Sequence, residues 1–413
     1  MKQERLIIVL LAAIHFTNIM DFMIIMPLGP SLMRSFHITP RQFSNLVSAY
    51  TISAGIFGLV ASFFIDRYDR KLMLLLIYTG FIAGTLSCAL ASGYKTLLLC
   101  RVLTGAFGGV LGALVLAIVG DIIPFERRAS AIGSITTAFS LASVLGVPFG
   151  LYLATKFTMW TAPFYLLTGL GLVLLILVYI KIPSIRIHME QAGEGIRKSS
   201  FSLLAGIFKN KSQVSALLLM FTLIMGQFAV IPFISPYMVF NVKFKESQLA
   251  YIYLLGGGAT IFTARLIGIY ADRKGKYRVF RTFALLSVIP LFVLTNMGHA
   301  KLALALAVTT VFFIVVSGRM IPAMALITST VDAKYRGSFM SINTCVQQLS
   351  AGIASLLAGA VIVKGKKGEL LNFEYVGFFA IALTLLAIWA AWRIKLPETQ
   401  NKVIEKPGPL PAA

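Results

Sequence analysis

The sequence has few acidic residues, few cysteines and few histidines for its 413 residues. Asp and Glu together number 15, and there are three Cys and four His. The three cysteines, Cys88, Cys100 and Cys345, all lie inside apolar runs, so the sequence predicts neither a disulfide framework nor a metal site. It also contains no nucleophile, metal cluster or paired acid and base in the arrangement that catalysis requires. We therefore expect a protein that is not an enzyme and that needs no cofactor.

Hydrophobic residues are what the chain has in excess. They make up 58% of the sequence, charged residues make up 13%, and the mean hydropathy is +0.86. A soluble domain is about half apolar and a quarter charged, so this composition is typical of a membrane protein. The opening MKQER and its apolar run resemble a signal peptide, but no small-residue cleavage site follows and many similar runs come later. We interpret the run as a first membrane helix.

Twelve apolar stretches are long enough to cross a bilayer, which takes about 20 residues. They are expected at 6–28, 43–65, 72–91, 96–119, 129–153, 163–182, 213–234, 248–270, 279–297, 302–328, 338–363 and 374–392. The predicted fold class is an all-α polytopic membrane protein. We divide the chain into an N-terminal six-helix bundle (1–182), a cytoplasmic linker (183–212), a C-terminal six-helix bundle (213–396) and a disordered cytoplasmic tail (397–413). Within the linker, FSLLAGIF at 201–208 is expected to lie along the membrane surface.

The basic residues predict how the chain is oriented. Most of the 37 Lys and Arg lie at the N-terminus, in the loops on the same side and in the tail, and only Arg101, Arg265 and Arg319 fall within spans. By the positive-inside rule, both termini are expected in the cytoplasm. We expect the protein to be integral to the cell membrane, which in bacteria is the inner membrane. The net charge of +22 therefore reports topology, and we expect no nucleic-acid partner.

The two halves of the chain repeat each other. FTNIMDFMIIMP at 16–27 aligns with FTLIMGQFAVIP at 221–232, and IDRYDRK at 65–71 aligns with ADRKGKY at 271–277. Such repeats are typical of secondary transporters, whose substrate site lies near the midplane between the repeats. We expect two pseudo-symmetric six-helix bundles. Where the first copy has Asp21, the second has Gly226, followed by Gln227.

Asp21 is the one acidic residue expected inside the membrane. A carboxylate there is unfavourable by several kcal/mol and is usually functional. At a rise of 1.5 Å per residue it lies about 22 Å from Leu6, with Thr17 and Asn18 on the same helix face. A carboxylate that alternates between burial and a nearby cation as the molecule opens to either side can carry one proton per cycle. The alternative is a structural carboxylate permanently paired with arginine.

Arg101 is the candidate partner of Asp21 for this proton coupling. The same helical rise places Arg101 about 10 Å nearer the outside, a gap that its long side chain partly closes. Snorkelling of Arg101 to the outer interface is the alternative.

Other polar residues within the spans are candidates for substrate binding. Arg319 is in mid-span with no acid inside the second half, so it either attracts an anionic or polar substrate group or contacts carbonyls in a helix bent beside Pro322. Asn343 and Gln347 share a helix face, and they and Gln227 either bind substrate or join helices by hydrogen bonds. The candidates are Thr17, Asn18, Tyr50, Gln227, Arg319, Asn343 and Gln347.

Four short motifs, in order along the chain, carry a family resemblance. They are SFFIDRYDRK (62–71), CRVLTGAFGG (100–109), VLGVPFGLYLA (144–154) and GIYADRKGK (268–276). The chain resembles the major facilitator superfamily and, within it, the twelve-helix drug:proton antiporters and sugar-efflux proteins. It departs from the first motif of that family at Ser62 and Asp69, where the family prefers glycine.

The motifs predict a gate and a packing site. Asp66, near the positive helix end at Ser338, is expected to form a cytoplasmic gate with Arg70 and Asp121. Asp272 and Arg273 are the second copy of this gate, and a solvated cluster that only sets topology is the alternative. Small residues let helices approach closely in membranes. We therefore expect a helix-packing motif, with a hinge as its alternative, at Gly146, Pro148 and Gly150.

These features predict a secondary active transporter. We expect proton-coupled export of small amphipathic molecules, either drug-like compounds or metabolites, by alternating access, with H+ as the coupling ion and Asp21 as its carrier. Its partners are a small-molecule substrate and the lipid bilayer, and it is expected to act as a monomer. The alternatives are sugar or metabolite efflux by the same cycle, uptake by symport or facilitated diffusion, and a sensor with a transporter fold. A channel is disfavoured because no ring of charge is present.

Overall fold

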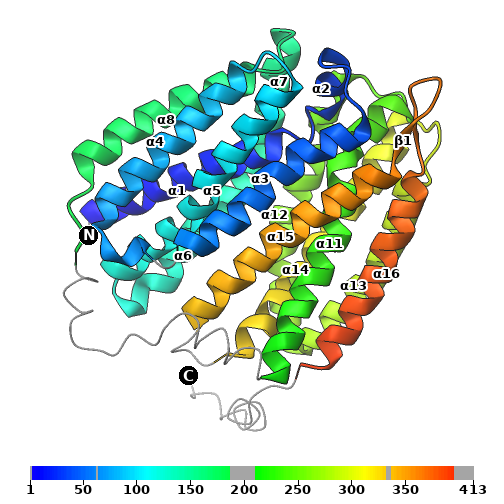
Figure 1. Cartoon of the computed structure of the whole chain (residues 1–413). Coiled ribbons are helices and arrows are strands. Elements are labelled where there is room, and N and C mark those ends of the chain that lie inside the picture. Colours follow the sequence, from blue (N-terminus) through cyan, green and yellow to red (C-terminus); the bar gives the residue numbers. More distant parts are fainter. Residues whose placement is uncertain (1, 62–63, 187–209, 332–335, 395–413) are drawn as a thin grey trace.

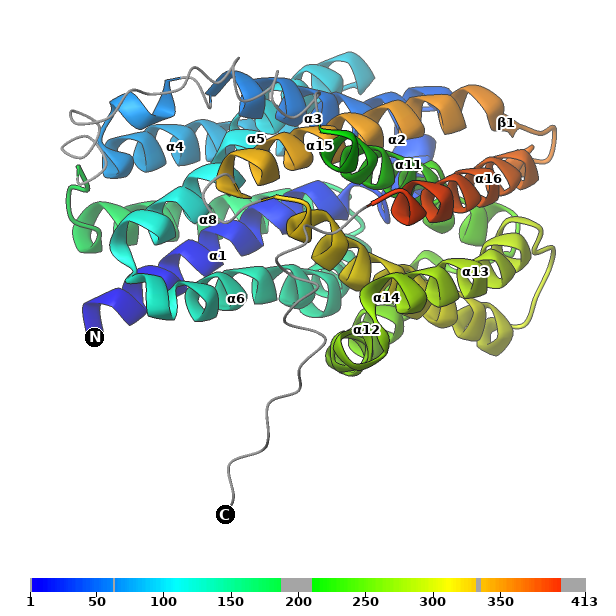
Figure 2. The same cartoon turned by 90° about the horizontal axis from the view of Figure 1, so that it is seen from below.

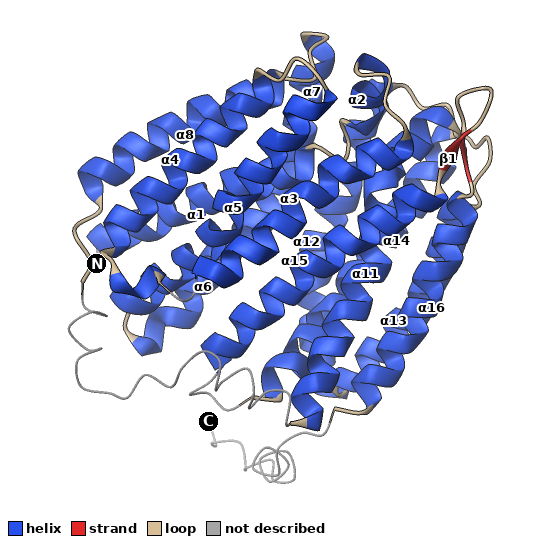
Figure 3. Ribbon diagram, in the orientation of Figure 1, coloured by secondary structure: helices blue, strands red, loops and turns tan. Residues whose placement is uncertain are grey.

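The computed structural model describes residues 2–61, 64–186, 210–331 and 336–394 and is almost entirely helical (Figures 1 and 3). Within these residues, twelve helices are long and apolar enough to cross a membrane, which confirms the predicted fold class. The predicted surface segment at 201–208 and the predicted disordered tail lie outside the described residues.

Six spans precede residue 187 and six follow residue 209. The spans of the first half are α1 (Lys2–Ile24), α3 (Pro40–Ala61), α4 (Arg70–Ala89), α5 (Tyr94–Ile122), the interrupted span α6 (Phe125–Leu141), η2 (Ala142–Gly146) and α7 (Val147–Lys156), and α8 (Ala162–Lys181). Those of the second half are α11 (Lys211–Phe240), α12 (Leu249–Lys274), α13 (Lys276–Thr295), α14 (Leu302–Ser329), α15 (Arg336–Val361) and α16 (Phe373–Trp392). Short elements connect them: α2 (Gly29–Ser35), η1 (Ile65–Arg67), η4 (Glu246–Gln248) and a hairpin of β1 (Val363–Lys364) and β2 (Leu370–Leu371).

The fifth span differs from the single helix expected at 129–153. A π-helical turn, η2, separates α6 from α7, and Pro148 lies in the first turn of α7. Proline has no N–H to donate, and its ring crowds the carbonyl four residues earlier. A single π turn accommodates such a break without ending the span. The hairpin of β1 and β2 was also not predicted, because two-residue strands leave no periodic pattern.

Successive spans run in opposite directions, so the helix ends gather on two sides. The start of α1 and the end of α16 lie on one side, which we call the terminal side; α2 and the hairpin lie on the other, the distal side (Figure 1). Among the described residues, the apolar core is continuous between the halves on the distal side, where Phe43 and Val147 of the first half share one cluster with Phe233 and Phe373 of the second. The halves are thus joined firmly at one side.

Two separate cores occupy the terminal side. One is built only from the first half, around residues such as Leu11 and Leu114. The other is built only from the second half, around Leu219 and Phe280. On this side each half therefore buries its own apolar residues without the other.

Two pairs of helical segments from opposite halves approach each other closely. One pair is α3 and α15, which lie side by side in both views (Figures 1 and 2). Ser355 Oγ of α15 donates a hydrogen bond of 3.3 Å to the Ser44 carbonyl of α3, and a Cβ at Gly352 would lie 2.4 Å from the Ile52 side chain. The other pair is η2 and α12, where Gly257 approaches Val144. Small residues permit both approaches.

A polar latch holds the halves together on the distal side. Glu246 of η4 accepts a hydrogen bond of 2.5 Å from Ser31 Oγ and one of 2.6 Å from Arg34 Nη1, both on α2. The Arg34 guanidinium also lies 5.4 Å from the centre of the Phe240 ring. We call Ser31, Arg34 and Glu246 the distal latch.

Candidate functional site

Asp21 is on α1, inside the first half, and its side chain contacts α4 and α5. Arg101 Nη1 of α5 is 2.8 Å from Asp21 Oδ2, and neither side chain is exposed at all. Thr85 Oγ1 of α4 donates a hydrogen bond of 3.2 Å to the other carboxylate oxygen. Two opposite charges are therefore paired away from solvent, with a third helix contributing a neutral donor.

The side chains of Asp21 and Arg101 are in contact, so the expected offset of about 10 Å in depth does not keep them apart. That estimate assumed helices perpendicular to the membrane. α5 has 29 residues, more than the about 20 that a perpendicular crossing needs, and long spans tilt. Depth counted along a tilted helix overstates the separation of its residues across the membrane.

An aromatic ring and an amide complete the environment of Arg101. Its guanidinium carbon lies 4.4 Å from the centre of the Tyr50 ring of α3, a cation–π geometry. Tyr50 Oη donates to Asn18 Oδ1 at 2.8 Å, and Asn18 Nδ2 donates to the Gly108 carbonyl at 3.0 Å. The chain of contacts links α1, α3 and α5 around the ion pair.

Glycines of α5 make this arrangement possible. A Cβ at Gly105 would lie 2.4 Å from the Tyr50 carbonyl oxygen, and one at Gly109 would lie 2.2 Å from that of Ala54. Real Cβ atoms do not approach backbone atoms so closely, so only glycine lets α5 pack this near to α3. The glycines of the CRVLTGAFGG motif therefore place the Tyr50 ring over Arg101.

Thr17, Asn18 and Tyr50 were predicted to contact substrate. All three are buried, with 2%, 7% and 2% of their surfaces exposed. Thr17 Oγ1 donates to the Ile14 carbonyl at 2.8 Å and lies 3.0 Å from Tyr78 Oη. In this conformation Tyr50 and Asn18 support Arg101, and Thr17 joins α1 to α4 through Tyr78.

Thr85 and Tyr78 were not identified from the sequence. Hydroxyl residues are common within spans and usually bond to their own helix backbone, so neither carries a distinctive signal. The depth of Thr85 was the available clue. It lies 15 residues after the start of α4, about 22 Å along the helix, which matches the depth estimated for Asp21.

Arg319 of α14 is the buried cation of the second half. It is 1% exposed, and its Nη1 donates to Ser287 Oγ at 3.1 Å and to Thr384 Oγ1 at 2.9 Å. Its partners among the described residues are thus hydroxyl groups of α13 and α16 and not the predicted helix carbonyls, while contact with a substrate group stays a prediction. Within the described residues no carboxylate pairs with it.

The position of Gly226 explains why Arg319 has hydroxyl partners. Gly226 is the counterpart of Asp21, and a Cβ there would lie 3.2 Å from the Ala380 carbonyl oxygen. The same oxygen accepts a hydrogen bond of 2.8 Å from Thr384, which in turn accepts from Arg319. The cation of the second half is thus linked through Thr384 to the backbone beside Gly226, the position that corresponds to Asp21.

Three amide side chains of the second half were also predicted to bind substrate. Asn343 is fully buried, and neither its oxygen nor its nitrogen has a hydrogen-bond partner among the described residues. The same holds for Gln227 Oε1, and Gln347 is half-buried. A buried polar group without a partner is unfavourable by about 1–3 kcal/mol, so Asn343 and Gln227 are the strongest candidates for contact with a ligand.

The predicted gate is described in part. Arg70 Nε lies 2.8 Å from Asp121 Oδ2 on the terminal side, and the Arg70 side chain is 5% exposed. The side chains of Asp66 and Ser338 lie outside the described residues. Asp272 and Arg273 are exposed at the end of α12, and neither forms an ion pair in the described part of the chain.

Asp69, noted above only as a departure from a glycine, has a clear structural role. It caps α4 by accepting from the Lys71 and Leu72 N–H groups, and it binds Ser184 and Arg186, which follow α8. Partial burial opposes ionisation of Asp69, but the hydrogen bonds from Ser184, Lys71 and Arg186 outweigh it and lower its pKa to about 2. The residue therefore joins the loop after α3 to the segment after α8 at neutral pH.

The predicted packing motif of the fifth span faces α1. A Cβ at Gly146 would lie 3.1 Å from Met20 Sδ, and one at Gly150 would lie 2.8 Å from Ile24 Cδ1. Both contacts are on the stretch of α1 that carries Asp21. Pro148, between the two glycines, begins α7 after the π turn.

Comparison with known proteins identifies relatives along almost the whole chain. The family model of the Major Facilitator Superfamily matches residues 11–355 and 217–412. The uncharacterized MFS-type transporter YceJ of Bacillus subtilis (strain 168) is 24% identical over 366 residues, which cover 88% of this chain and 91% of YceJ.

Two solved structures have a similar fold. One is a D-xylose-proton symporter, with a TM-score of 0.76 at 17% identity over 96% of this chain and 98% of that chain. The other is a bacterial homolog of the human lysosomal transporter Spinster in an inward-facing and unoccupied conformation, with a TM-score of 0.74 at 15% identity over 94% of this chain and 95% of that chain. At these identities the likeness concerns the fold alone.

Proposed function

The chain belongs to the Major Facilitator Superfamily and is a membrane transporter, and we propose that it exports small amphipathic molecules in exchange for protons, with Asp21 as the proton carrier. Membership of this transporter family also means that the protein is not an enzyme. Beyond family membership, we propose the direction of transport, the coupling ion and the residue that carries this ion. We also propose that the terminal side lies in the cytoplasm and that the protein acts as a monomer in the cell membrane.

The buried Asp21–Arg101 ion pair is the observation that carries the proposal. Removing a charge from water is unfavourable by several kcal/mol even in a pair, and a well-packed apolar pair of similar size is often at least as stable. An ionisable pair inside a transporter span is therefore expected to serve transport. Asp21 can lose its charge by binding a proton, whereas the Arg101 guanidinium stays charged.

The conformation fits one step of such a cycle. The halves share a core on the distal side and have separate cores on the terminal side, as expected for a state that loads substrate from the cytoplasm. In that state an antiporter must have released its proton, and a carboxylate bonded to a guanidinium is the deprotonated form. Opening of the distal side would let a proton reach Asp21. Protonation would break the bond between Asp21 and Arg101 as substrate is released on that side.

Polar groups of the second half complete the proposal for substrate. Gln227, Asn343 and Gln347 would supply hydrogen bonds, and Phe228 of α11, whose ring centre lies 5.8 Å from that of Phe22 of α1, would supply an apolar contact. Such a mixture suits an amphipathic molecule with few polar groups. Arg319 adds attraction for a polar or anionic group.

Replacing Asp21 with asparagine is expected to abolish substrate-dependent proton movement. Asparagine keeps the shape of the side chain and its contact with Thr85, but it has no proton to exchange. In energised inverted vesicles, a transported compound should collapse the pH gradient with the wild type and not with Asp21→Asn. A chemically varied panel of compounds would also name the substrate class.

The matched control is Glu374→Gln, which removes a half-buried carboxylate at the distal start of α16 and should leave proton movement unchanged. Both variants need a counterflow measurement, in which exchange of labelled compound needs no proton. If Asp21→Asn moves protons as the wild type does on an active compound, Asp21 is structural and its role as carrier is wrong.

Weakening the distal latch is expected to favour the state that opens on the distal side. Glu246→Gln removes the ion pair with Arg34, which is partly exposed and therefore worth up to about 1 kcal/mol, or about fivefold in the ratio of the two states. Met26→Cys, a buried position of the distal core, would report opening by its labelling rate with an impermeant maleimide. The background should lack Cys88, Cys100 and Cys345.

The control for the latch is Glu369→Gln, in the hairpin between α15 and α16, whose carboxylate forms no ion pair with the first half among the described residues. It should label at the parent rate. Equal rates for Glu246→Gln and Glu369→Gln would mean that the latch does not affect the equilibrium between the two states.

Proton-coupled uptake is the second candidate function, because one protein with a similar fold is a D-xylose-proton symporter. An Asp–Arg pair serves symport as readily as antiport. The direction of the pH change in the vesicle assay separates the two, since a symporter moves substrate and proton the same way.

A further inference from the structure

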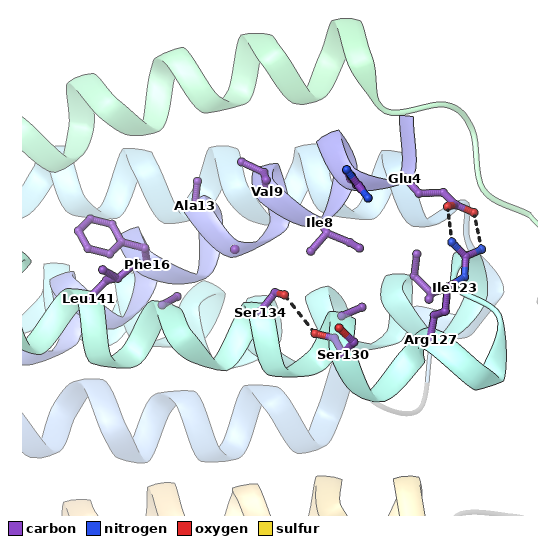
Figure 4. Close-up of a pocket in the computed structure, with 14 residues that line it drawn as sticks. Glu4, Ile8, Val9, Ala13, Phe16, Ile123, Arg127, Ser130, Ser134 and Leu141 are labelled. Carbon is purple, nitrogen blue, oxygen red and sulfur yellow. Dashed lines mark hydrogen bonds and ion pairs between the residues drawn. The ribbon is translucent and has the colours of Figure 1, made fainter. Parts of the chain in front are cut away.

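A groove lies between α1 and α6 on the terminal side of the first half (Figure 4). It encloses about 820 Å³. Small and apolar residues of both helices form its walls: Ile8, Val9, Ala12, Ala13, Ser134 and Leu141. None of the predicted transport residues lines it, so it is separate from the site described above.

The groove faces away from the core of the first half. The opposite face of α1, with Ile7, Leu11 and Ile14, is buried in that core. Val9 in the groove is 62% exposed. In Figure 4, α6 and α8 flank α1 on either side, and Val9 and Ala13 point toward α8. All of the lining belongs to the first half, so the groove opens sideways between α6 and α8.

In a membrane this surface meets lipid. The lining of α1 belongs to the span Glu4–Ile24, and apolar surface exposed within a span contacts acyl chains. From Arg5 to Phe16 the groove wall runs about 16 Å along α1. Alanine and serine on both helices leave a channel that an acyl chain can fill.

The mouth of the groove is positively charged. Arg5 is exposed there and forms no ion pair within the described residues. Arg127 donates two hydrogen bonds to Glu4, of 3.1 and 3.3 Å. Among the described residues that line the mouth, Arg5 is therefore the cation that is available to bind a ligand. Guanidinium groups at the level of lipid headgroups bind phosphate well.

We propose that this groove binds one anionic phospholipid from the terminal-side leaflet, with an acyl chain along Ala12 and Ala13 and its phosphate on Arg5. This binding requires only that the chain spans a membrane, as its family does, and that the groove lies on the terminal side. It does not depend on export, proton coupling or Asp21. The lipid would brace α1, the helix of Asp21, against α6.

A second groove provides a comparison within the same molecule. It lies between α12 and α14, encloses about 720 Å³, and has no charged side chain in its lining, which includes Leu254, Ala303 and Leu306. It can accept acyl chains but has no group that selects a headgroup. Selectivity for anionic lipid therefore depends on the mouth of the first groove.

The test is binding of defined lipids to the full chain in detergent, measured by native mass spectrometry and by the shift in melting temperature. Phosphatidylglycerol, phosphatidylcholine and soluble glycerol 3-phosphate are the three probes. The wild type should bind phosphatidylglycerol more tightly than phosphatidylcholine. Arg5→Gln should weaken phosphatidylglycerol binding about fivefold, since one basic residue near lipid phosphate is worth about 1 kcal/mol.

Ala13→Phe should fill the groove and lower occupancy by both phospholipids. The matched controls are Arg278→Gln, an exposed arginine at the terminal start of α13, and Ala83→Phe, an exposed alanine of α4. Both should bind as the wild type does. If Ala13→Phe fails to fold, the comparison of Arg5→Gln with Arg278→Gln still decides the headgroup contact.

Three results would overturn the proposal. One is equal binding of the two phospholipids by the wild type, and another is unchanged phosphatidylglycerol binding by Arg5→Gln. The third is a full thermal shift with glycerol 3-phosphate alone, which would assign the site to a soluble phosphate. Transport plays no part in these measurements, so a failure here is distinct from a failure of the proposed function.

Discussion

Replacing Arg101 with glutamine is expected to destabilise the protein by about 3–5 kcal/mol, because it leaves the Asp21 carboxylate buried without its cation. Neither partner of the pair is exposed, and they are 2.8 Å apart. Thr85 offers the carboxylate one neutral hydrogen bond, which does not replace a charge. Unfolding of the purified protein in detergent, by heat or by denaturant, would measure the loss.

Two further variants separate the effect of the pair from the effect of losing an arginine. Arg265→Gln removes an exposed arginine from the α12 span and should change stability by less than about 0.5 kcal/mol. The double variant Asp21→Asn with Arg101→Gln has no charge left at this site and should recover part of the loss. If the double variant is as unstable as the sum of both single variants, the two residues are not coupled.

The second large effect is expected from a single methyl group on α5. Gly109→Ala places a Cβ 2.2 Å from the Ala54 carbonyl oxygen and 2.5 Å from its Cα. Backbone atoms cannot rotate away as a side chain does, so α3 and α5 must separate, at a loss of about 1–3 kcal/mol or more. Since α3 carries Tyr50 over Arg101, transport should fall together with stability.

Gly120→Ala is the control on the same helix. Among the described residues, no atom beyond the neighbouring backbone of α5 lies within 4 Å of a Cβ at that position. Alanine is the better helix former by about 1 kcal/mol, so this variant should be as stable as the wild type or more stable. Melting temperatures that fall equally for both variants would contradict the close contact between α3 and α5.

The sequence predicted the fold well because apolar length alone defines a membrane span. Twelve runs and a weak repeat were sufficient for the family fold. The break in the fifth span was not found, because the motif around Pro148 suggested packing or a hinge, and neither specifies a π turn. Backbone geometry of this kind depends on how the helix is held by its neighbours.

The centre of the site was predicted less completely. Asp21 and Arg101 stand out because charges are rare in spans, so their pairing was accessible from residue type, although depth counted along the helices placed them about 10 Å apart. Thr85 and Ser287 are ordinary hydroxyl residues, and their roles appear only when α4 and α13 are placed beside the cations. Thr17 and Tyr50 were expected at a substrate surface, but a helical face says nothing about which neighbour covers it.

The shared distal core has a consequence for temperature. Under alternating access, opening of the distal side exposes Phe43 and Phe233 to water while the terminal-side surfaces come together. Burial of apolar surface changes the heat capacity in proportion to its area, and apolar contacts weaken on cooling. Any difference in apolar area between the two closures will therefore appear as curvature in a plot of the logarithm of the state ratio against inverse temperature. The sign of that curvature tells which of the two closures buries more apolar surface.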